Sequence, residues 1–485
     1  MPNWLKKRAY LTPERPAIIF KGESISFAKL YHNAYKIAGK LTAIGIRNKQ
    51  FTAVLLKNHV DSVVILLALQ LIGVRAVILN NRLTADEIIW QINDSKAAFF
   101  LSEELFHDKL ENISRSLPAL SVFTKEDLIQ SSFEEPQIIE EIDLDEICTI
   151  MYTSGTTGYP KGVIQTYGNH WWSATGSALN LGLHENDCWL CTVPLFHISG
   201  YSILMKSIIY GMKIVLYERF DVNETISDIR DEQVTIMSVV STTLTMILDQ
   251  LENERLPKRF RCMLLGGGPA SLALLERCIE KEIPVFQTYG MTETSSQIVT
   301  LSPEDSFRKL GSAGKPLFPS QIKIIQDGKE AAANEPGEIV VKGPNVTTGY
   351  LNRESATKSL HEGWLHTGDI GYLDEDGFLF VLDRRSDLII SGGENIYPAE
   401  IEGVLTSHPA IKDAGVIGKQ DDKWGEIPVA FLVRKASVVV SDITSYCEER
   451  LAKYKIPKEI YFVDDIPRNA SKKILRRELR KLLNE

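Results

Sequence analysis

The chain has 485 residues, of which 44% are hydrophobic and 24% are charged, and its formal net charge is −9. That length suits about three domains, and the composition is ordinary for a soluble globular protein. The acidic charge argues against a nucleic-acid-binding protein, because such a protein would present a basic surface.

The sequence predicts no secretion signal and no integral membrane segment. Prolines and charged residues at positions 13–16 interrupt any apolar core after the basic residues 6–8. The most apolar segment, Val63–Leu79, contains a glutamine, a glycine and an arginine, so we interpret it as a buried helix followed by a strand. Six cysteines do not make a disulfide scaffold in a chain of this length, and we expect a reducing, cytoplasmic compartment.

Cys188 and Cys191 have the C-x-x-C spacing that occurs in zinc and redox sites. Their segment is typical of a strand, and no second cysteine pair has metal-binding spacing. We therefore expect two small core residues, with a zinc or redox role as the less favoured alternative.

The first 146 residues alternate between helical and strand patterns. Apolar residues recur at helical spacing over Ser26–Leu41, whereas Phe51–Leu56 and Ala76–Asn80 are typical of short buried strands. Glu103–Glu141 is more polar, and we expect an irregular surface segment there. Repeated alternation of strands and helices predicts parallel sheets covered by helices.

The middle of the chain continues this alternation and then changes character. Four further apolar segments are expected to be strands: Trp189–Val193, Lys213–Tyr217, Thr235–Val240 and Cys262–Leu265. Between residues 320 and 382, short apolar runs alternate with turn signals such as Asp-Gly, which predicts a β-rich subdomain.

A polar stretch at residues 383–387 separates two apolar runs, and we place a domain boundary there. The sequence thus predicts a large domain over residues 1–382, a hinge over residues 383–387 and a small domain over residues 388–485. The predicted fold class is α/β, with helix-covered, mostly parallel sheets and a β-rich subdomain, followed by a small mobile α+β domain.

The small domain should contain its own core. We expect helices at Pro398–Leu405 and near Ile443–Tyr454, with strands near residues 414–417 and 429–433. The basic tail, Arg468–Arg480, is interpreted mainly as a solvated helix face.

The stretch Met151–Gly162 combines glycines, hydroxyl side chains and a lysine directly after a predicted strand, Ile147–Tyr152. Glycines let backbone N–H groups approach phosphate oxygens, hydroxyl groups donate further hydrogen bonds, and a lysine supplies positive charge. The spacing differs from that of the P-loop, so an NTPase of that class is not predicted. We interpret the stretch as a polyphosphate-binding loop, with a flexible surface loop as the alternative. Its candidate ligands are Thr153, Ser154, Gly155, Thr156, Thr157 and Lys161.

Seven short motifs follow one another along the chain. They are residues 153–162, Pro194–Gly200, Gly266–Ala270, Gln287–Thr294, Gly337–Pro344, Trp364–Asp369, and Arg384 with Ser391–Glu402. Together they resemble the adenylate-forming superfamily, which includes acyl-CoA synthetases, luciferases and the adenylation domains of peptide synthetases. The resemblance covers essentially the whole chain, and it implies an acid–thiol ligase that uses ATP, Mg²⁺ and coenzyme A.

The superfamily carries out two half-reactions. A carboxylate attacks the α-phosphate of ATP to give an acyl-adenylate and pyrophosphate, and a thiol then displaces AMP. Because an anion must approach a polyanion, the first half-reaction needs Mg²⁺ and cationic groups where negative charge builds up. By resemblance, the glycine- and hydroxyl-rich loop holds the β- and γ-phosphates, Thr292 reaches the α-phosphate, and Glu293 binds Mg²⁺. The alternative for Glu293 is a carboxylate at a helix start.

The adenosine site implied by the resemblance combines glycine backbone, an aromatic face and charged groups. Tyr289 would stack on the base, Asp369 would take both ribose hydroxyls, and Arg384 would bind the ribose from the other side. Glycines would let the backbone lie against the base. The remaining members of this nucleotide site are Gly266, Gly267, Gly268, Gln287, Thr288 and Gly290.

The superfamily motif Pro-Lys-x-x-x-Gly-Lys corresponds to Pro467–Lys473, so the resemblance assigns the catalytic lysine to Lys473. This lysine would stabilise the charge that develops between the carboxylate and the α-phosphate. The chain departs from the motif at Arg468 and Lys472, where lysine and glycine are usual, which leaves open the choice between Lys472 and Lys473. A lysine in a solvated basic tail is the alternative.

The resemblance also implies a rotation of the small domain between the half-reactions. Ser386 occupies the hinge position, and a short polar linker suits a hinge because it can absorb large backbone changes. After rotation, the segment that begins with Ser391, Gly392 and Gly393 would lie beside a channel for the thiol of coenzyme A.

Two residues concern the acid. His197 occupies the aromatic or histidine position that gates the acid and the thiol in the superfamily, and a buried core histidine is the alternative. Lys206 lies in an otherwise apolar helical stretch, where burial is costly unless the lysine meets an anion; it could instead extend to the surface. A functional Lys206 would fit an acid with a second carboxylate.

Four phrases of the sequence resemble one branch, the o-succinylbenzoate–CoA ligases of menaquinone biosynthesis. They are Gly168–Ala174, Leu264–Ala270, Met291–Pro303 and Leu382–Gly393. The resemblance implies a 2-succinylbenzoate–CoA ligase whose partners are an aromatic dicarboxylic acid, ATP and coenzyme A. The alternatives are another aryl- or acyl-CoA ligase, or an enzyme that loads a carrier protein. The sequence leaves open whether the chain forms a homo-oligomer.

Overall fold

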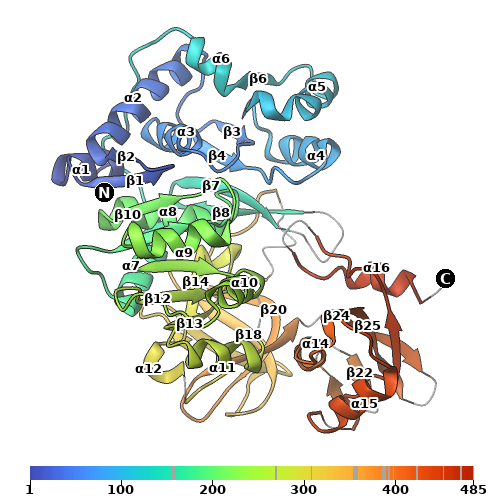
Figure 1. Ribbon diagram of the computed structural model, residues 1–485. Coiled ribbons are helices and arrows are strands. Elements are labelled where there is room, and N and C mark those ends of the chain that lie inside the picture. The colour runs from blue at the N-terminus through green and yellow to red at the C-terminus, as the bar shows by residue number, and fades with distance from the viewer. Residues whose placement is uncertain are drawn as a thin grey trace.

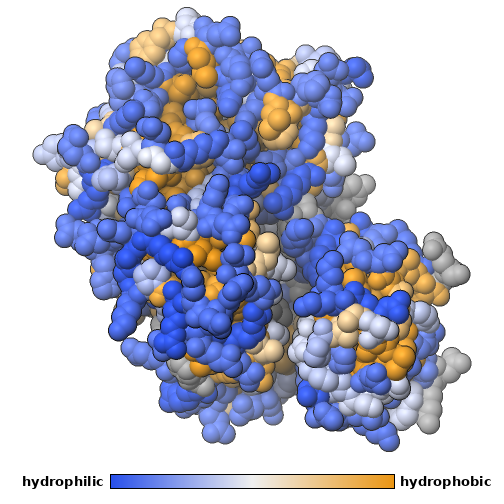
Figure 2. Space-filling view, viewed as in Figure 1, coloured by the Kyte–Doolittle hydropathy of each residue, from blue (hydrophilic) through white to orange (hydrophobic). Residues whose placement is uncertain are grey.

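In the computed structural model the chain forms a large body and, beyond strand β21 (Leu379–Arg384), a smaller C-terminal body drawn in orange and red (Figure 1), and the space-filling view from the same side shows the same two bodies (Figure 2). The structure describes residues 1–153, 160–267, 270–306, 308–352, 359–384, 389–391, 394–396, 398–421, 424–451, 453–469 and 472–483. These residues form four sheets, three in the large body and one in the small body.

The first sheet is parallel except for one edge strand. Its order is β6-β5-β3-β4-β7-β8, and β8 alone runs antiparallel to its neighbour. The strands are β3 (Phe51–Val54), β4 (Arg75–Ile78), β5 (Phe99–Ser102), β6 (Ser121–Thr124), β7 (Ile147–Thr153) and β8 (Lys161–Thr166). Side chains alternate between the two faces of these strands, and α4 (Ala85–Ser95) and α5 (His107–Ser116) cover one face.

The second sheet has the order β15-β14-β13-β12-β11-β9-β10-β1-β2 and is parallel through its centre. Its strands are β1 (Pro16–Phe20), β2 (Glu23–Ser26), β9 (Cys188–Cys191), β10 (Lys213–Leu216), β11 (Ile236–Val239), β12 (Cys262–Leu265), β13 (Val285–Met291), β14 (Ser296–Thr300) and β15 (Lys315–Pro316). Helices α7 (Tyr167–Leu181) and α8 (Ile198–Tyr210) cover one face. The other face is covered by α9 (Val222–Asp231), α10 (Ser241–Leu251) and α11 (Leu272–Glu280).

One continuous hydrophobic core joins the two sheets. It contains α7 and α8 together with α1 (Trp4–Leu11), α2 (Phe27–Ala43) and α3 (Val60–Leu71). Helix α3 suits this place because every residue from Ser62 to Leu71 is buried, as expected for a helix that is apolar on all sides. The two sheets and the helices between them are therefore one packed unit.

The third sheet is antiparallel and confirms the predicted β-rich subdomain. Its strands are β16 (Gln321–Gln326), β17 (Lys329–Glu330), β18 (Gly337–Lys342), β19 (Leu360–His361), β20 (Trp364–Leu373) and β21. A short helix, α12 (Pro303–Ser306), precedes it. Strand β21 ends at Arg384, so the first two residues of the predicted hinge still belong to this sheet.

The small body packs helices against a sheet of order β23-β22-β25-β24, with β26 added beside β25. Its strands are β22 (Ile389–Ser391), β23 (Glu394–Ile396), β24 (Ile411–Asp421), β25 (Gly425–Arg434) and β26 (Glu459–Phe462), and its helices are α14 (Pro398–Thr406), α15 (Val440–Glu448) and α16 (Arg476–Lys481). The expected helix near Ile443–Tyr454 thus starts and ends earlier than predicted.

The structure differs from the expectation for one polar segment and adds an exception to another. Within Glu103–Glu141, the structure has a 3₁₀ turn (Glu104–Phe106), α5, the edge strand β6 and α6 (Lys125–Gln130). Pairing of β6 with β5, and a capping box at the start of α6, order a segment that has little apolar periodicity. In the basic tail, most of the described basic residues are exposed, as expected, but Arg476 is only 7% exposed and donates to Glu402 Oε1 (2.8 Å) and the Val416 carbonyl (3.0 Å).

The interpretation of Cys188 and Cys191 as core residues is confirmed. Both thiols are free and buried, and they lie at opposite ends of β9. Because side chains alternate along a strand, Cys188 packs into one core and Cys191 into the other, so they cannot act as a pair. Separately, within the described residues no helix is both long and apolar enough to cross a membrane.

Candidate active site

The first part of the site is the hairpin of β7 and β8. Thr153, the last residue of β7, pairs with Lys161, the first residue of β8. The Lys161 ammonium lies 5.4 Å from the centre of the Tyr350 ring, which is brought there by a bridge between Val163 and Tyr350. The predicted ligands Ser154, Gly155, Thr156 and Thr157 lie outside the described residues.

The second part follows the carboxyl ends of β12 and β13. Gly267 has a φ of 85°, and a Cβ on it would lie 3.1 Å from Val240 Cγ1. Gly290 lies at an irregularity in the β13–β14 register, where a Cβ would lie 2.0 Å from the Ser296 carbonyl oxygen. These positions require glycine because the backbone conformation or the neighbouring strand leaves no room for a side chain. Gly268 lies outside the described residues. Gly266 directly follows β12, whereas Gln287 and Thr288 lie within β13.

Tyr289 and Asp369 lie together although 80 residues separate them in the sequence. The Tyr289 phenol donates a hydrogen bond of 2.9 Å to Asp369 Oδ2, and Asp369 is 8% exposed. Asp369 stands opposite Arg384 in the β20–β21 ladder, so the backbones of these two predicted ribose contacts are neighbours. The side chain of Arg384 lies outside the described residues.

The 3₁₀ turn after β13 carries Thr292 and Glu293, and three other residues fix it. Gln165 Nε2 donates to the Thr292 carbonyl (2.9 Å), while the Thr347 N–H donates to the Glu293 carbonyl (2.7 Å). The Tyr350 phenol donates to Glu293 Oε1 (3.1 Å). Tyr350 thus contacts both Glu293 and Lys161, which joins the second part of the site to the first.

Sequence reasoning missed Gln165, Thr347 and Tyr350. Gln165 gave one usable signal, since it is a polar residue inside the otherwise apolar segment of β8 and is fully buried. Thr149 Oγ1 donates to Gln165 Oε1 (2.8 Å), so the amide is held from both sides. A buried glutamine with both ends bonded is a rigid support for the turn that carries Thr292.

The metal-ligating side chains of the site suit a magnesium ion whose ligands come mainly from the substrate. Within the described residues there is no group of three or more metal-ligating side chains. Mg²⁺ commonly uses one or two protein carboxylates and completes its shell with phosphate oxygens and water. A single carboxylate, Glu293, which shares its neighbour Tyr350 with the loop lysine Lys161, therefore fits a magnesium ion that arrives with a nucleotide.

His197 lies between β9 and α8, as the N-cap residue of that helix. Its imidazole is partly covered, and burial, with a smaller contribution from the positive charge of Arg82, lowers its pKa to about 4. The ring is therefore neutral at physiological pH. The Phe196 ring lies 4.6 Å away, so the two aromatic groups form one wall.

Lys206 is buried in α8 and does not extend to the surface, which excludes the alternative in which its ammonium reaches solvent. It is 1% exposed, its ammonium lies 5.1 Å from the centre of the Trp189 ring, and it donates to Gln297 Oε1 at 3.3 Å. None of the described carboxylates forms an ion pair with it. Burial lowers its pKa from 10.5 to about 7. A cation held this way offers a binding site to an anion.

The loop that carries Lys473 is a tight turn in the small body. Arg468 and Ile474 form a β-bridge, and the Lys473 N–H donates to Asn469 Oδ1 (2.9 Å). Lys472 has a φ of 64°, the left-handed conformation that favours glycine, and this is the position where the superfamily motif has glycine. The backbone thus keeps the conformation of the motif, which supports Lys473 as its final lysine.

The hinge and channel residues are described only in part. Ser386, Gly392 and Gly393 lie outside the described residues. Ser391 ends β22, is 8% exposed and pairs with Gly425 of β25.

Comparison with known proteins identifies the class. The family model for AMP-binding enzymes matches residues 5–351, and the model for the C-terminal domain of AMP-binding enzymes matches residues 400–473. The chain belongs to the family of AMP-binding enzymes. The resemblance to the adenylate-forming superfamily, and with it the predicted fold class, is confirmed.

Two relatives of this chain within the family share one named reaction. The chain is 53% identical, over 100% of its length and 99% of the relative, to a 2-succinylbenzoate–CoA ligase of Bacillus cereus (strain Q1). It is 52% identical to the o-succinylbenzoate CoA synthetase of Bacillus subtilis in complex with the acyl-adenylate intermediate OSB-AMP. That comparison has a TM-score of 0.95 and covers 99% of this chain and 98% of the other.

A second solved structure of the same synthetase gives a lower score. This double mutant, bound with its product analogue OSB-NCoA, has a TM-score of 0.78 with this chain, at 52% identity and with 99% and 98% coverage.

Proposed function

We propose that the chain is a 2-succinylbenzoate–CoA ligase, which by resemblance acts in menaquinone biosynthesis. The observation that carries the substrate assignment is Lys206, a fully buried cation whose described partners are a neutral amide and an aromatic ring. Full-length identity to such ligases supports the proposal. Free, buried cysteines support a reducing compartment, for which we propose the cytoplasm.

In the first half-reaction, a carboxylate oxygen of the acid attacks the α-phosphorus of ATP and pyrophosphate leaves. Thr153, Lys161 and the loop between them would hold the β- and γ-phosphates, and Thr292 would donate to the α-phosphate. Glu293 would bind Mg²⁺, which when bound would neutralise phosphate charge. Tyr289 would face the base. Its contact with Asp369 supports a shared role at the adenosine, with the Asp369 carboxylate on the ribose hydroxyls.

The acid would lie against α8. Lys206 would pair with the carboxylate that is not activated, whereas neutral His197 would border the entrance without repelling or neutralising an approaching anion. When the ammonium exchanges the neutral amide for a carboxylate, both partners of its hydrogen bond are charged, and the bond becomes an ion pair with a stronger attraction. This geometry favours a dicarboxylic acid over a monocarboxylic acid of the same shape.

The small body would serve both half-reactions. Lys473 would stabilise charge at the forming acyl–phosphate bond. After movement about a hinge at Ser386, the segment from Ser391 to Gly393 would border the channel through which the sulfur of coenzyme A attacks the acyl carbon. AMP then leaves and the thiol proton passes to solvent.

The decisive experiment measures pyrophosphate release with ATP, Mg²⁺ and a panel of acids, followed by detection of the thioester. We expect turnover with o-succinylbenzoate and a CoA thioester as product. Turnover with a monocarboxylic benzoate but not with o-succinylbenzoate would refute the substrate assignment. Transfer to the pantetheine arm of a carrier protein, in place of coenzyme A, would favour the loading-enzyme alternative.

A further inference from the structure

Asn58 lies where the carboxyl edges of the two parallel sheets meet. It comes four residues after the end of β3 in the first sheet, and its side chain reaches the ends of β9 and β10 in the second sheet. Carboxyl edges of parallel strands are where ligands bind in α/β proteins. A side chain that links two such edges can control the relative position of residues on both.

The Asn58 amide makes three hydrogen bonds, all to backbone groups of the second sheet. Its Nδ2 donates to the carbonyls of Val193 (3.0 Å) and Tyr217 (3.2 Å), and its Oδ1 accepts from the Leu195 N–H (2.8 Å). The side chain is 5% exposed. Asparagine is suited to this task because one planar group supplies two donors and an acceptor.

The bonds to Val193 and Leu195 hold the segment Val193–His197, five of the six residues between β9 and α8, which we call the gate segment. His197 is the last residue of the gate segment and occupies the N-cap position of α8, the helix that carries Lys206. The segment is packed tightly against that helix: a Cβ on Gly200 would lie 2.2 Å from the Pro194 carbonyl oxygen. A shift of the gate segment would therefore move the first turn of α8 with it.

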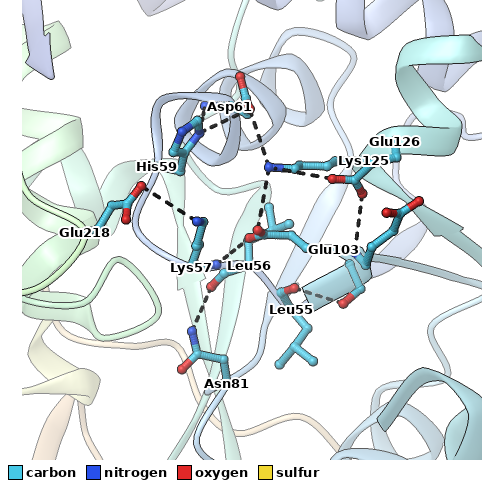
Figure 3. Close-up of polar contacts among 12 residues, drawn as sticks. Leu55, Leu56, Lys57, His59, Asp61, Asn81, Glu103, Lys125, Glu126 and Glu218 are labelled. Atoms are coloured by element: carbon cyan, nitrogen blue, oxygen red, sulfur yellow. Dashed lines mark hydrogen bonds and ion pairs between the residues drawn. The ribbon is translucent and has the colours of Figure 1, made fainter. Parts of the chain in front are cut away.

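Asn58 is itself held in place from the first sheet. The N–H of the preceding residue, Lys57, donates to Glu103 Oε1 (2.7 Å), and Glu103 is only 2% exposed (Figure 3). The Lys57 ammonium points across to Glu218, 3.7 Å away and one residue beyond Tyr217 (Figure 3). Asn58 thus projects from a backbone that is fixed before any ligand binds.

We propose that Asn58 is a positioning residue for acid binding: its amide fixes the gate segment, and through it His197 and the helix that carries Lys206. This inference rests on the proposed function, because it takes the gate segment and α8 as the wall of the acid site. Loss of the two donated bonds leaves the buried carbonyls of Val193 and Tyr217 without this partner, and the gate segment must move for the Val193 carbonyl to pair again. The nucleotide site lies on other strands and keeps its geometry.

The test compares Asn58→Asp with Asn81→Asp. Aspartate has the shape of asparagine but lacks the two donors. Asn81 is a matched control at the same edge: its Nδ2 donates to the Leu56 carbonyl (3.2 Å), and none of the hydrogen bonds between described residues joins its side chain to the gate segment (Figure 3 shows the bond to Leu56). For Asn58→Asp we expect the KM for the acid to rise at least tenfold and the KM for ATP to stay within twofold. For Asn81→Asp both should stay within twofold.

A second measurement needs no substrate. Asn58→Leu has a similar size and lacks the acceptor as well as the donors, so hydrogen exchange at the Leu195 amide should be at least tenfold faster in Asn58→Leu than in the wild-type protein, and unchanged in Asn81→Asp. Asn58→Ser keeps one hydroxyl donor, so its KM for the acid and its exchange rate at Leu195 should lie between those of the wild type and the stronger variants. It replaces the aspartate variant in the test if that variant does not fold. Unchanged exchange, or an ATP KM that rises as much as the acid KM, would overturn the role of Asn58. Failure of the wild-type protein to use any acid would instead refute the proposed function.

Discussion

Replacing Lys206 with methionine should stabilise the folded protein and weaken binding of the dicarboxylic acid. Methionine is similar in length and volume but has no charge, so it fills the buried space beside Trp189 without needing an anion. If Lys206 served only to pack the core, its replacement would not make the protein more stable and at the same time weaken acid binding. Such a trade-off is typical of residues that serve a binding site.

The expected gain in the free energy of unfolding follows from the pKa of Lys206, which burial lowers from 10.5 to about 7. Below pH 7 the lysine is charged in both the folded and the unfolded chain, and the folded state bears the full cost of the buried charge. Each pKa unit corresponds to about 1.4 kcal/mol, so that cost is roughly 5 kcal/mol. As the pH rises from 7 to 10.5, the unfolded chain binds more protons than the folded one, and the cost declines.

Urea unfolding of wild type and Lys206→Met at two pH values checks the sign and the size. The gain in free energy of unfolding should be roughly 5 kcal/mol at pH 6.5 and about 1.4 kcal/mol at pH 9.5. The KM for o-succinylbenzoate should rise at least tenfold, as expected for a lost charged contact. Lys213→Met, at a partly exposed lysine on β10, is the control and should show no such gain. A gain that does not depend on pH, or an unchanged KM, would refute the reasoning.

Three further outcomes are expected. Asp369→Asn should raise the KM for ATP about tenfold or more, because a hydrogen bond to a charged group contributes roughly 1.5–3 kcal/mol; an unchanged KM in pyrophosphate release would exclude Asp369 from the nucleotide site. Lys472→Gly should raise the free energy of unfolding by up to about 1 kcal/mol, since its φ of 64° is costly for any residue with a Cβ; destabilisation in urea would contradict the left-handed conformation. Gly290→Ala should lower the free energy of unfolding by about 2 kcal/mol, because its Cβ would meet the Ser296 carbonyl at 2.0 Å; full stability would argue against that register.

The sequence predicted strands well where burial and periodicity agree. Cys262–Leu265 was expected as a strand and forms β12 with the same bounds, because a continuous apolar run suits a strand covered on both faces. Strand β6 was missed for the opposite reason. It lies at the edge of its sheet, so one side is unpaired and its residues need not be apolar.

The candidate site could be predicted as a set of residues but not as a set of contacts. Ordered motifs pointed to Tyr289 and Asp369 separately, yet their hydrogen bond joins segments 80 residues apart and has no local signature. The bond from Asn58 to Val193 spans 135 residues, and Asn58 belongs to none of the quoted motifs. Side chains that support a site from a distance are determined by tertiary packing, which a pattern in one segment does not encode.

The hairpin of β20 and β21 has a practical consequence for measuring this protein. Arg384 ends β21 opposite Asp369, so the chain leaves the large body at the residue that faces the proposed ribose contact. A dye pair with one member at the exposed Tyr10 and the other at the exposed Trp424 would span this exit point. Energy transfer between the dyes would then report movement of the small body about the proposed hinge as an optical signal, without following the chemistry at all.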